Sequence, residues 1–288
     1  MKTLFMRLPF LMTACLVLSF SAAAQDRIVS GGGDVTEIIF ALGEGDRIAA
    51  TDSTSVYPLK AMVTPKVGYV RNLSAEGVLS VEPDLILISG AAGPAEALDQ
   101  IRATGVPMVE MKTEYTVEAI LEKTVQVAEA IGVPEKGAEL AATIEAEWTD
   151  AQQAIDTLEG DPSVLFFSTV ADGSPTAAGK DTAAHGVIEM IGGTNAFGER
   201  TGYKPISFES AVAADPDIIL VMNFVVARMG GIEEVISHPA ISLTSAAQND
   251  RVFMVDADTV MQFSPRPPKA AGLLAEEIKA RLDGADAS

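Results

Sequence analysis

The chain has 288 residues, of which 48% are hydrophobic, and it carries 40 acidic residues against 20 basic ones. The resulting net charge of −20 repels nucleic acid and anionic lipid, which excludes both as principal partners. With a single cysteine the fold cannot depend on disulfides, so its stability must come from a hydrophobic core.

Residues 1–24 have the pattern of a cleaved signal peptide. Two basic residues precede an apolar run over 8–20, and an Ala-x-Ala sequence follows it. The run is shorter than the roughly 18 apolar residues that indicate a spanning helix, and Cys15 lies inside it rather than at the cleavage point of a lipoprotein. We therefore expect an exported, soluble protein. Its mature charge is −22, because the leader removes two of the 20 basic residues and none of the 40 acidic ones.

Residues 25–133 alternate short apolar runs with amphipathic stretches, which indicates a first α/β lobe. Runs such as DLILIS are apolar throughout, as strands covered on both faces are. Strands separated by helices favour a mostly parallel sheet. The expected strands span 27–30, 46–51, 84–89 and 106–111, and the expected helices span 35–43, 95–105 and 117–132.

Residues 161–288 show the same alternation and form a second expected lobe. Strands are expected over 163–170, 217–222 and 251–256, and helices over 181–193 and near 231–237.

One long amphipathic helix is expected over 134–160, between the lobes. A proline suits its start and a glycine its end, while apolar residues at three- and four-residue spacing form one buried stripe. At 1.5 Å per residue such a helix spans about 35 Å and is a stiff connector. The predicted fold class is therefore α/β, with two Rossmann-like lobes that contain mostly parallel sheets and are joined by a single long α-helix.

A weak internal repeat relates the two lobes. LSAEGVLSVEPDLILIS (73–89) and ISFESAVAADPDIILVM (206–222) align without a gap. Each contains a serine, a glutamate two residues later, a Pro-Asp pair and an apolar strand at the same offset. The repeat predicts lobes of related topology.

Enzyme motifs are absent from the sequence. It contains no G-x-S-x-G elbow, no Walker loop and no H-E-x-x-H motif, and its glycine-rich segment SGGGDVTE lacks the dinucleotide-binding spacing. The two histidines are too few for a metal site of several imidazoles. His185 falls in the first turn of an expected helix, where it either faces a ligand crevice or is an exposed helix-start residue. His238 is interpreted as a surface residue.

A tyrosine and an arginine stand two residues apart in VGYVRNLSAEG (67–77). In an extended segment, Tyr69 and Arg71 point the same way. A phenolate suits ferric iron and is a known axial ligand of haem, and a nearby guanidinium favours the charged phenol or pairs with a ligand carboxylate. An ordinary half-buried tyrosine beside a solvated arginine explains the same spacing, so both interpretations stay open.

The repeat carries a matched pair of glutamates, Glu76 and Glu209, each two residues after a serine that can cap a helix. Their charges complement the helix dipoles, which explains each residue locally. Alternatively, they are acidic knobs, one on each lobe, that dock on basic pockets of a partner.

Four segments together resemble the periplasmic haem-binding proteins of bacterial haem ABC importers, which are class III substrate-binding proteins. They are RIVSGGGDVTEIIFALGEGDRI, PKVGYVRNLSAEGVLSVEPDLIL, AAGKDTAAHGVIEMIGGTNAF and FSPRPP, and the similarity covers nearly all of the mature chain. The GYxRxLSAEG block is the most specific part.

This resemblance implies a monomeric, non-enzymatic periplasmic carrier that holds haem between its lobes and reaches the membrane only through an ABC permease. It implies Tyr69 as the axial iron ligand, with Arg71 beside it contacting the tyrosine or the haem. It implies Glu76 and Glu209 as the residues that engage the permease. Some members of the family add a histidine from the second lobe, which here is His185.

The propionates of haem need positive charge despite the acidic surface. The candidates for this charge, besides the arginine beside the tyrosine, are Lys66, Arg228 and Arg266.

Two other functions compete with this one. A ferric-siderophore or cobalamin binding protein shares the scaffold but needs no axial tyrosine. An exported α/β hydrolase belongs to another class, and it is disfavoured because no nucleophile–base pair can be assembled.

Overall fold

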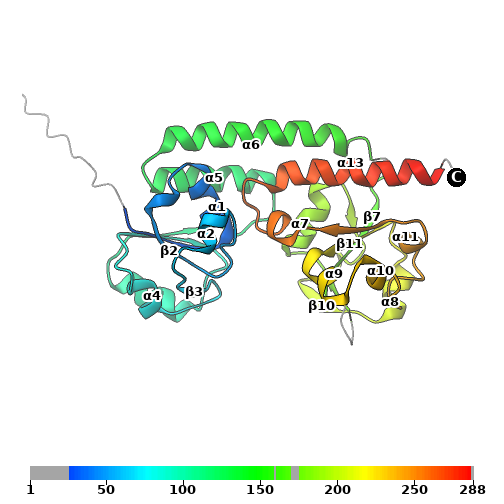
Figure 1. Ribbon diagram of the computed structural model, residues 1–288, viewed down its shortest axis with the longest axis horizontal. Helices are drawn as coiled ribbons and strands as arrows, with labels where there is room; N and C mark the ends of the chain where they lie inside the picture. The colour runs from blue at the N-terminus through cyan, green and yellow to red at the C-terminus, as the bar shows by residue number, and fades with distance from the viewer. Residues whose placement is uncertain (1–25, 159, 170–174, 287–288) are drawn as a thin grey trace, which may run out of the picture.

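The computed structural model describes residues 26–158, 160–169 and 175–286. Two lobes lie side by side along the long axis of the molecule, and helix α6 (Pro134–Ile155) runs along both (Figure 1). The predicted fold class, two α/β lobes joined by a long helix, is confirmed. The expected signal peptide, Cys15 included, lies outside the described residues. Within them, no helix combines the length and apolar character needed to cross a membrane.

The first lobe is built on a four-stranded parallel sheet in the order β2-β1-β5-β6. Strand β5 is buried along its whole length, as its unbroken apolar sequence predicts. All four expected strands are present, with ends that differ by no more than two residues from the expected ones. The elements are β1 (Ile28–Gly31), α1 (Gly33–Ala41), η1 (Gly45–Arg47), β2 (Ile48–Thr51), α2 (Leu59–Met62), β3 (Gly68–Tyr69), β4 (Asn72–Leu73), α3 (Ala75–Leu79), β5 (Leu85–Ser89), α4 (Ala95–Ala103), β6 (Met108–Met111) and α5 (Val117–Ala130).

The second lobe has a sheet in the order β10-β8-β7-β11-β12, with β9 paired to β7. Its strands β7, β11 and β12 are parallel and correspond to the three strands expected from the sequence. The elements are β7 (Ser163–Thr169), β8 (Thr176–Ala178), α7 (Ala183–Met190), β9 (Thr194–Asn195), β10 (Tyr203–Pro205), α8 (Phe208–Ala214), β11 (Ile218–Met222), α9 (Asn223–Met229), α10 (Ile232–Ile236), α11 (Ser245–Gln248), β12 (Val252–Val255), α12 (Ala257–Val260) and α13 (Pro267–Asp286).

Three short strands of this lobe, β8, β9 and β10, were not predicted. They are two or three residues long, too short for a period-two pattern to show in the sequence. Strands β8 and β10 run antiparallel and extend the sheet at one edge. Their pairing partners, rather than their own sequence, define them.

The repeat predicted from the sequence appears as one substructure in each lobe. In the first lobe a serine-capped helix, α3, leads to the buried strand β5, and in the second a serine-capped helix, α8, leads to the buried strand β11. The two lobes therefore share this part of their topology.

Helix α6 packs against both α5 of the first lobe and α13 of the second (Figure 1). Glycines allow the close approach: a Cβ at Gly137 would lie 2.4 Å from the Cβ of Ala128 on α5, and one at Gly272 would lie 2.8 Å from the Cβ of Ala151. The helix proper ends at Ile155, earlier than the expected 160, and the chain continues in tight turns. Helix α13 was not predicted, and it doubles the helical layer over the second lobe.

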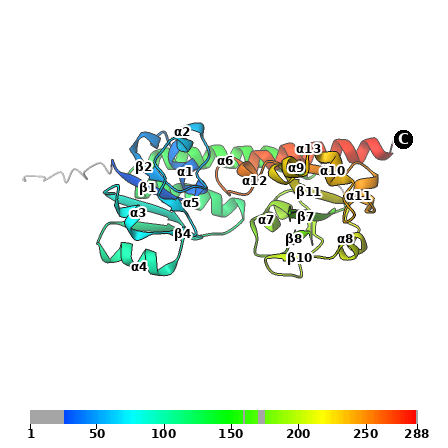
Figure 2. The same cartoon turned by 60° about the horizontal axis from the view of Figure 1, so that its bottom comes forward.

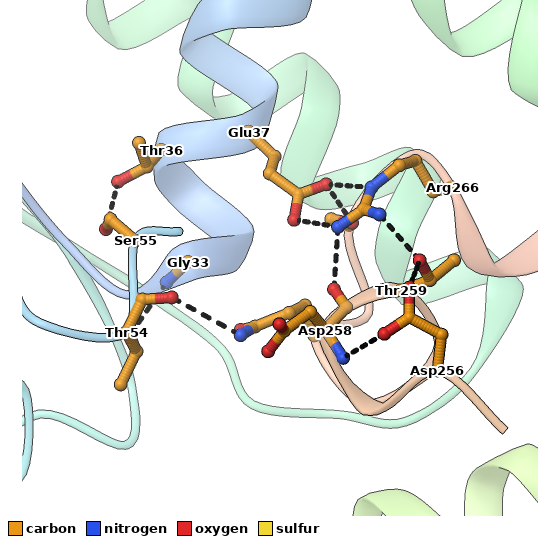
Figure 3. Close-up of polar contacts among 11 residues, drawn as sticks. Gly33, Thr36, Glu37, Thr54, Ser55, Asp256, Asp258, Thr259 and Arg266 are labelled. Carbon is orange, nitrogen blue, oxygen red and sulfur yellow. Dashed lines mark hydrogen bonds and ion pairs between the residues drawn. The ribbon is translucent and has the colours of Figure 1, made fainter. Parts of the chain in front are cut away.

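An ion pair joins the lobes beside this layer. Glu37 on α1 faces Arg266, which precedes α13, with Oε1–Nη2 and Oε2–Nε distances of 2.6 and 2.7 Å (Figure 3). Ser264 donates a further hydrogen bond to the carboxylate (2.7 Å). Arg266 also donates to the side chain of Thr259 and lies over the ring of Tyr57, 3.9 Å from its centre. The guanidinium is therefore committed to partners within the protein, although its side chain is 24% exposed.

Burial controls the protonation of Glu37. The carboxylate is almost fully buried, and this raises the pKa of Glu37 more than the hydrogen bonds from Arg266 and Ser264 lower it. The folded protein thus holds the proton of this group more tightly than the unfolded chain does. Its contribution to stability is present at acid pH and is lost as pH rises from the ordinary value of 4.5 through the raised pKa.

We expect the difference in melting temperature between the wild type and Glu37→Gln to shrink as pH rises from 4 to 7, as measured by thermal scans. Glu44→Gln is the matched control with the opposite sign. Hydrogen bonds from Lys136 and Arg47 lower the pKa of Glu44, so its contribution is lost as pH falls below 4.5. If the difference in melting temperature between the wild type and Glu37→Gln instead grew as pH rose, the raised pKa of Glu37 would be contradicted.

Candidate ligand-binding site

A cleft of about 470 Å³ lies between the lobes. From the first lobe it is lined by residues 69–71 and by segments that follow β1, β5 and β6; from the second it is lined by 181–183 and 202–203. The segment 261–263, which leads towards the ion pair between the lobes, completes the lining. In the first lobe, the cleft thus lies at the carboxyl ends of the parallel strands, where α/β sheets place their ligands.

The hairpin of β3 and β4 presents Tyr69 and Arg71 to this cleft. The two strands pair antiparallel, and Val70 and Arg71 form the turn between them. The sequence predicted one extended face for the tyrosine and arginine, whereas the tight turn brings them to the same wall. Tyr69 is 47% exposed, and within the described residues neither side chain makes a hydrogen bond or an ion pair. Both are therefore available to a ligand.

A second tyrosine, Tyr203, lines the cleft from the other lobe, where it begins β10. Its hydroxyl lies at the start of α7, next to the amide of Ala184 and the side chain of Thr182. Burial raises the pKa of Tyr203 more than these partners and the positive charge of Arg71 lower it. The phenol is therefore neutral at physiological pH and can donate a hydrogen bond.

Tyr203 was not predicted from the sequence, although a signal was present. GYKPIS (202–207) repeats GYVRNLS (68–74) with one residue fewer, and its last two residues begin the second copy of the internal repeat. Extending the repeat upstream with a one-residue gap would have identified the tyrosine.

The charges on the cleft lining nearly cancel. Lys123 and Asp34 form a buried ion pair at 2.6 Å, and the lysine also donates to the carbonyl of Phe263 (3.4 Å). Two further carboxylates, those of Glu114 and Asp181, line the cleft. Among the lining residues, Arg71 is thus the one cation without a bound anion. No group of three or more possible metal ligands occurs in the described part of the chain.

Three cations expected near the ligand lie outside the cleft lining. The ammonium of Lys66 donates to Thr51 Oγ1, the Ser55 carbonyl and the Ala61 carbonyl at 2.8 to 2.9 Å. Arg266 binds the carboxylate of the other lobe, and Arg228 is an exposed residue in the last turn of α9. Within the described structure, these residues therefore do not bring positive charge to the cleft walls.

His185 also lies outside the cleft lining. Its ring Nδ1 is 3.2 Å from the side-chain nitrogen of Asn195, and its Nε2 is 3.4 Å from a carboxylate oxygen of Glu189. Thr182 caps the helix through the amide of His185. The histidine is thus engaged along its own helix and with the β9 segment.

Glu76 and Glu209 are exposed in the first turns of α3 and α8. Ser74 and Ser207 cap these helices, accepting from the amides three residues later at 3.0 and 3.1 Å. The serines, and not Glu76 or Glu209, therefore cap these two helices. Figure 2 shows the two helices on different lobes, both away from α6.

Comparison with known proteins identifies relatives along most of the chain. The family model for periplasmic binding proteins matches residues 28–259. The structure of the periplasmic haem-binding protein RhuT from Roseiflexus sp. RS-1 is similar, with 36% identity and a TM-score of 0.83 over 89% of this chain and 99% of that one.

Two relatives differ in their described roles. The uncharacterized ABC transporter substrate-binding lipoprotein YvrC of Bacillus subtilis (strain 168) is 28% identical over 88% of this chain and 79% of its own length. The vitamin B12-binding protein of Vibrio parahaemolyticus serotype O3:K6 (strain RIMD 2210633) is 25% identical over 86% of this chain and 88% of its own.

The contacts of Lys66 predict a role in stability. Lys66→Met removes the donor from three backbone and side-chain acceptors, and we expect it to lower the free energy of unfolding by about 1 kcal/mol in urea titrations. Lys60→Met is the matched control, because that lysine is 78% exposed and has a single ion pair at 3.9 Å. It should change stability by less than about 0.5 kcal/mol; equal effects of the two variants would refute the role.

Proposed function

The chain belongs to the family of periplasmic binding proteins, and we propose that it binds haem between its lobes and delivers it to an inner-membrane ABC permease. As a member of this family it is a substrate-binding protein of an ABC importer and not an enzyme. The identity of the ligand, the residues that hold it and the docking residues are the parts that we propose.

The pairing of Tyr69 with Arg71 on one cleft wall is the observation that carries the proposal. A phenolate is a hard anionic ligand for ferric iron. The guanidinium beside it favours the charged form of the phenol and can bind a propionate. Both side chains are available in the cleft. The similarity to the haem-binding protein RhuT supports haem as the ligand.

Apolar residues of both lobes suit the faces of a porphyrin. Val70 and Ala91 line the cleft from the first lobe, and Ala183, Met261 and Phe263 line it from the second. Burying a flat tetrapyrrole against such side chains is favourable by about 25 cal/mol per Å² of apolar surface removed from water. The macrocycle would enter edge-on between the lobes.

Tyr203 supplies a polar group on the opposite wall. Because its raised pKa keeps the phenol neutral and its hydroxyl lies next to the Ala184 amide and the Thr182 side chain, we assign it a hydrogen bond to the ligand, or to water on the iron, rather than a bond to the metal. His185, which lies outside the cleft lining, would need to leave Asn195 and Glu189 to act as the second ligand.

Cobalamin is the second candidate ligand. The cleft offers one unpaired cation, Arg71, so a ligand without propionates also fits its charge. The similarity to the vitamin B12-binding protein supports this alternative. Cobalamin would need no phenolate, so the role of Tyr69 distinguishes the two ligands.

Titration with haemin, followed by visible absorption, tests the iron ligand. Tyr69→Phe should remove the iron–phenolate absorption and lower haemin affinity at least about tenfold, because the axial bond is lost. Tyr203→Phe should keep that absorption and lower affinity about two- to tenfold, the value of one hydrogen bond. Tyr57→Phe is the control, since this tyrosine lies outside the cleft lining.

Unchanged haemin affinity and spectrum in Tyr69→Phe would refute the iron-ligand assignment. Tight binding of cyanocobalamin that is unaffected by Tyr69→Phe would support the alternative ligand.

The exposed carboxylates of Glu76 and Glu209 support a docking role. We expect Glu76→Lys with Glu209→Lys to leave haemin affinity unchanged and to abolish haem transport into vesicles that contain the permease, because opposite charges are lost at the interface. Glu139→Lys with Glu145→Lys, which reverses two exposed charges on α6, controls for net charge and should transport normally. Normal transport by the first double variant would defeat the assignment.

A further inference from the structure

A buried carboxylate with an unusual number of hydrogen-bond donors lies behind the Tyr69–Arg71 hairpin. Asp52 follows β2 and is fully buried. Its Oδ1 accepts from Gly32 N and Ser55 Oγ, both at 2.9 Å. Its Oδ2 accepts from Thr54 N, Thr54 Oγ1 and Val70 N at 2.8, 2.7 and 3.3 Å. One side chain therefore satisfies five donors from three separate segments.

The most informative of these donors is the amide of Val70, which lies between Tyr69 and Arg71. The carbonyl of the same residue accepts from Gly93 N (2.9 Å), so the turn is held from two directions. The neighbouring strand is held as well, because Ser53 N donates to the Gly68 carbonyl (2.7 Å). Asp52 provides the side-chain bond at the tip of the hairpin, where both ligand-facing residues emerge.

The negative charge of Asp52 has a nearby positive charge, the ammonium of Lys66. No cation lies within ion-pair distance of it among the described residues. Burial lowers the pKa of Lys66, and the nearby carboxylate of Asp52 opposes part of that shift. Lys66 binds Thr51 and Ser55, which flank the aspartate. The ammonium of Lys66 therefore binds the residues around Asp52 rather than its carboxylate. The carboxylate oxygens of Asp52 remain free to accept from backbone amides and hydroxyls.

A carboxylate suits this place better than an amide. Five donors call for a group that only accepts hydrogen bonds. A carboxylate is such a group: its two oxygens offer about four lone-pair sites, so at least one site is shared, and its charge strengthens each bond. An asparagine would turn an NH₂ group towards N–H or O–H donors and leave them unsatisfied.

The same group also reaches the cleft through Thr54. The Thr54 hydroxyl accepts from Gly33 N (3.1 Å) at the start of α1 and donates to the aspartate. Gln262 from the second lobe donates to the Thr54 carbonyl (3.5 Å). The hairpin, the start of α1 and a contact between the lobes are thus connected through one carboxylate.

We propose that Asp52 is a positioning residue of the ligand site, whose carboxylate holds the Val70 amide and thereby sets the places of Tyr69 and Arg71. The inference rests on the proposed function in one respect, that these two residues contact the ligand. Asp52 itself is fully buried and lies outside the cleft lining.

Hydrogen exchange of the ligand-free protein tests the positioning without reference to any ligand. In Asp52→Asn, backbone amides of residues 67–73 should exchange at least about tenfold faster than in the wild type, since a charge-assisted bond is worth more than 1.4 kcal/mol. Ser55→Ala is the matched control: it removes a hydroxyl donor from the same carboxylate but leaves the Val70 bond. Its hairpin exchange should stay within about twofold of the wild type.

Haemin titration supplies the second readout. Asp52→Asn should weaken the iron–phenolate absorption and lower haemin affinity about tenfold, whereas Ser55→Ala should preserve both. Should Asp52→Asn fail to fold, replacing Val70 with its α-hydroxy acid removes the one N–H donor and keeps the side chain. That ester variant should loosen the hairpin in the same way.

The inference would be overturned if the backbone amides of residues 67–73 exchanged no faster in Asp52→Asn, or in the ester variant, than they do in Ser55→Ala. An absence of haemin binding by the wild type would instead overturn the proposed function, while the exchange measurement still decides the role of Asp52.

Discussion

The buried contact between Glu37 and Arg266 is the constraint on which the ligand cleft depends. It joins α1 of the first lobe to the segment that leads into α13, 229 residues away in the chain. Desolvating two charges is costly, and the bidentate geometry together with the bond from Ser264 offsets only part of that cost, which is why the pKa of Glu37 stays raised. Together with the packing of α6 against both α5 and α13, this contact joins the two lobes beside the cleft. Holding binding walls in place ahead of binding lowers its entropic cost.

The acidic composition makes positive charge scarce, and the structure commits most of it to internal contacts. Arg266 joins the lobes, Lys66 supports the loop around Asp52, and Lys123 is paired with Asp34 at the cleft. Arg71 remains without a partner on the lining. Among the residues that line the cleft, Arg71 is therefore the cation left free for an anionic group of a ligand.

The two lobes contain the same local arrangement of strand, capping serine and helix. In each, a tyrosine-bearing short strand precedes a serine-capped helix that starts with an exposed glutamate. The tyrosines, Tyr69 and Tyr203, meet at the cleft, while the glutamates lie outside it. The first hairpin turns tightly through Val70 and Arg71, whereas the second copy, one residue shorter, runs along a sheet edge. The first copy thus brings Tyr69 and Arg71 to the cleft, whereas the second brings Tyr203.

The sequence by itself determined the α/β alternation, the long helix and the Tyr69–Arg71 pair, because burial period and motif spacing are local properties. Strands β8 to β10 escaped prediction because they are too short to have a period. The tertiary structure alone decided which cations reach the cleft, and it removed Lys66 and Arg266 from it. Side-chain pairing across the fold leaves no trace in local patterns, since partners such as Glu37 and Arg266 meet only when both lobes are in place.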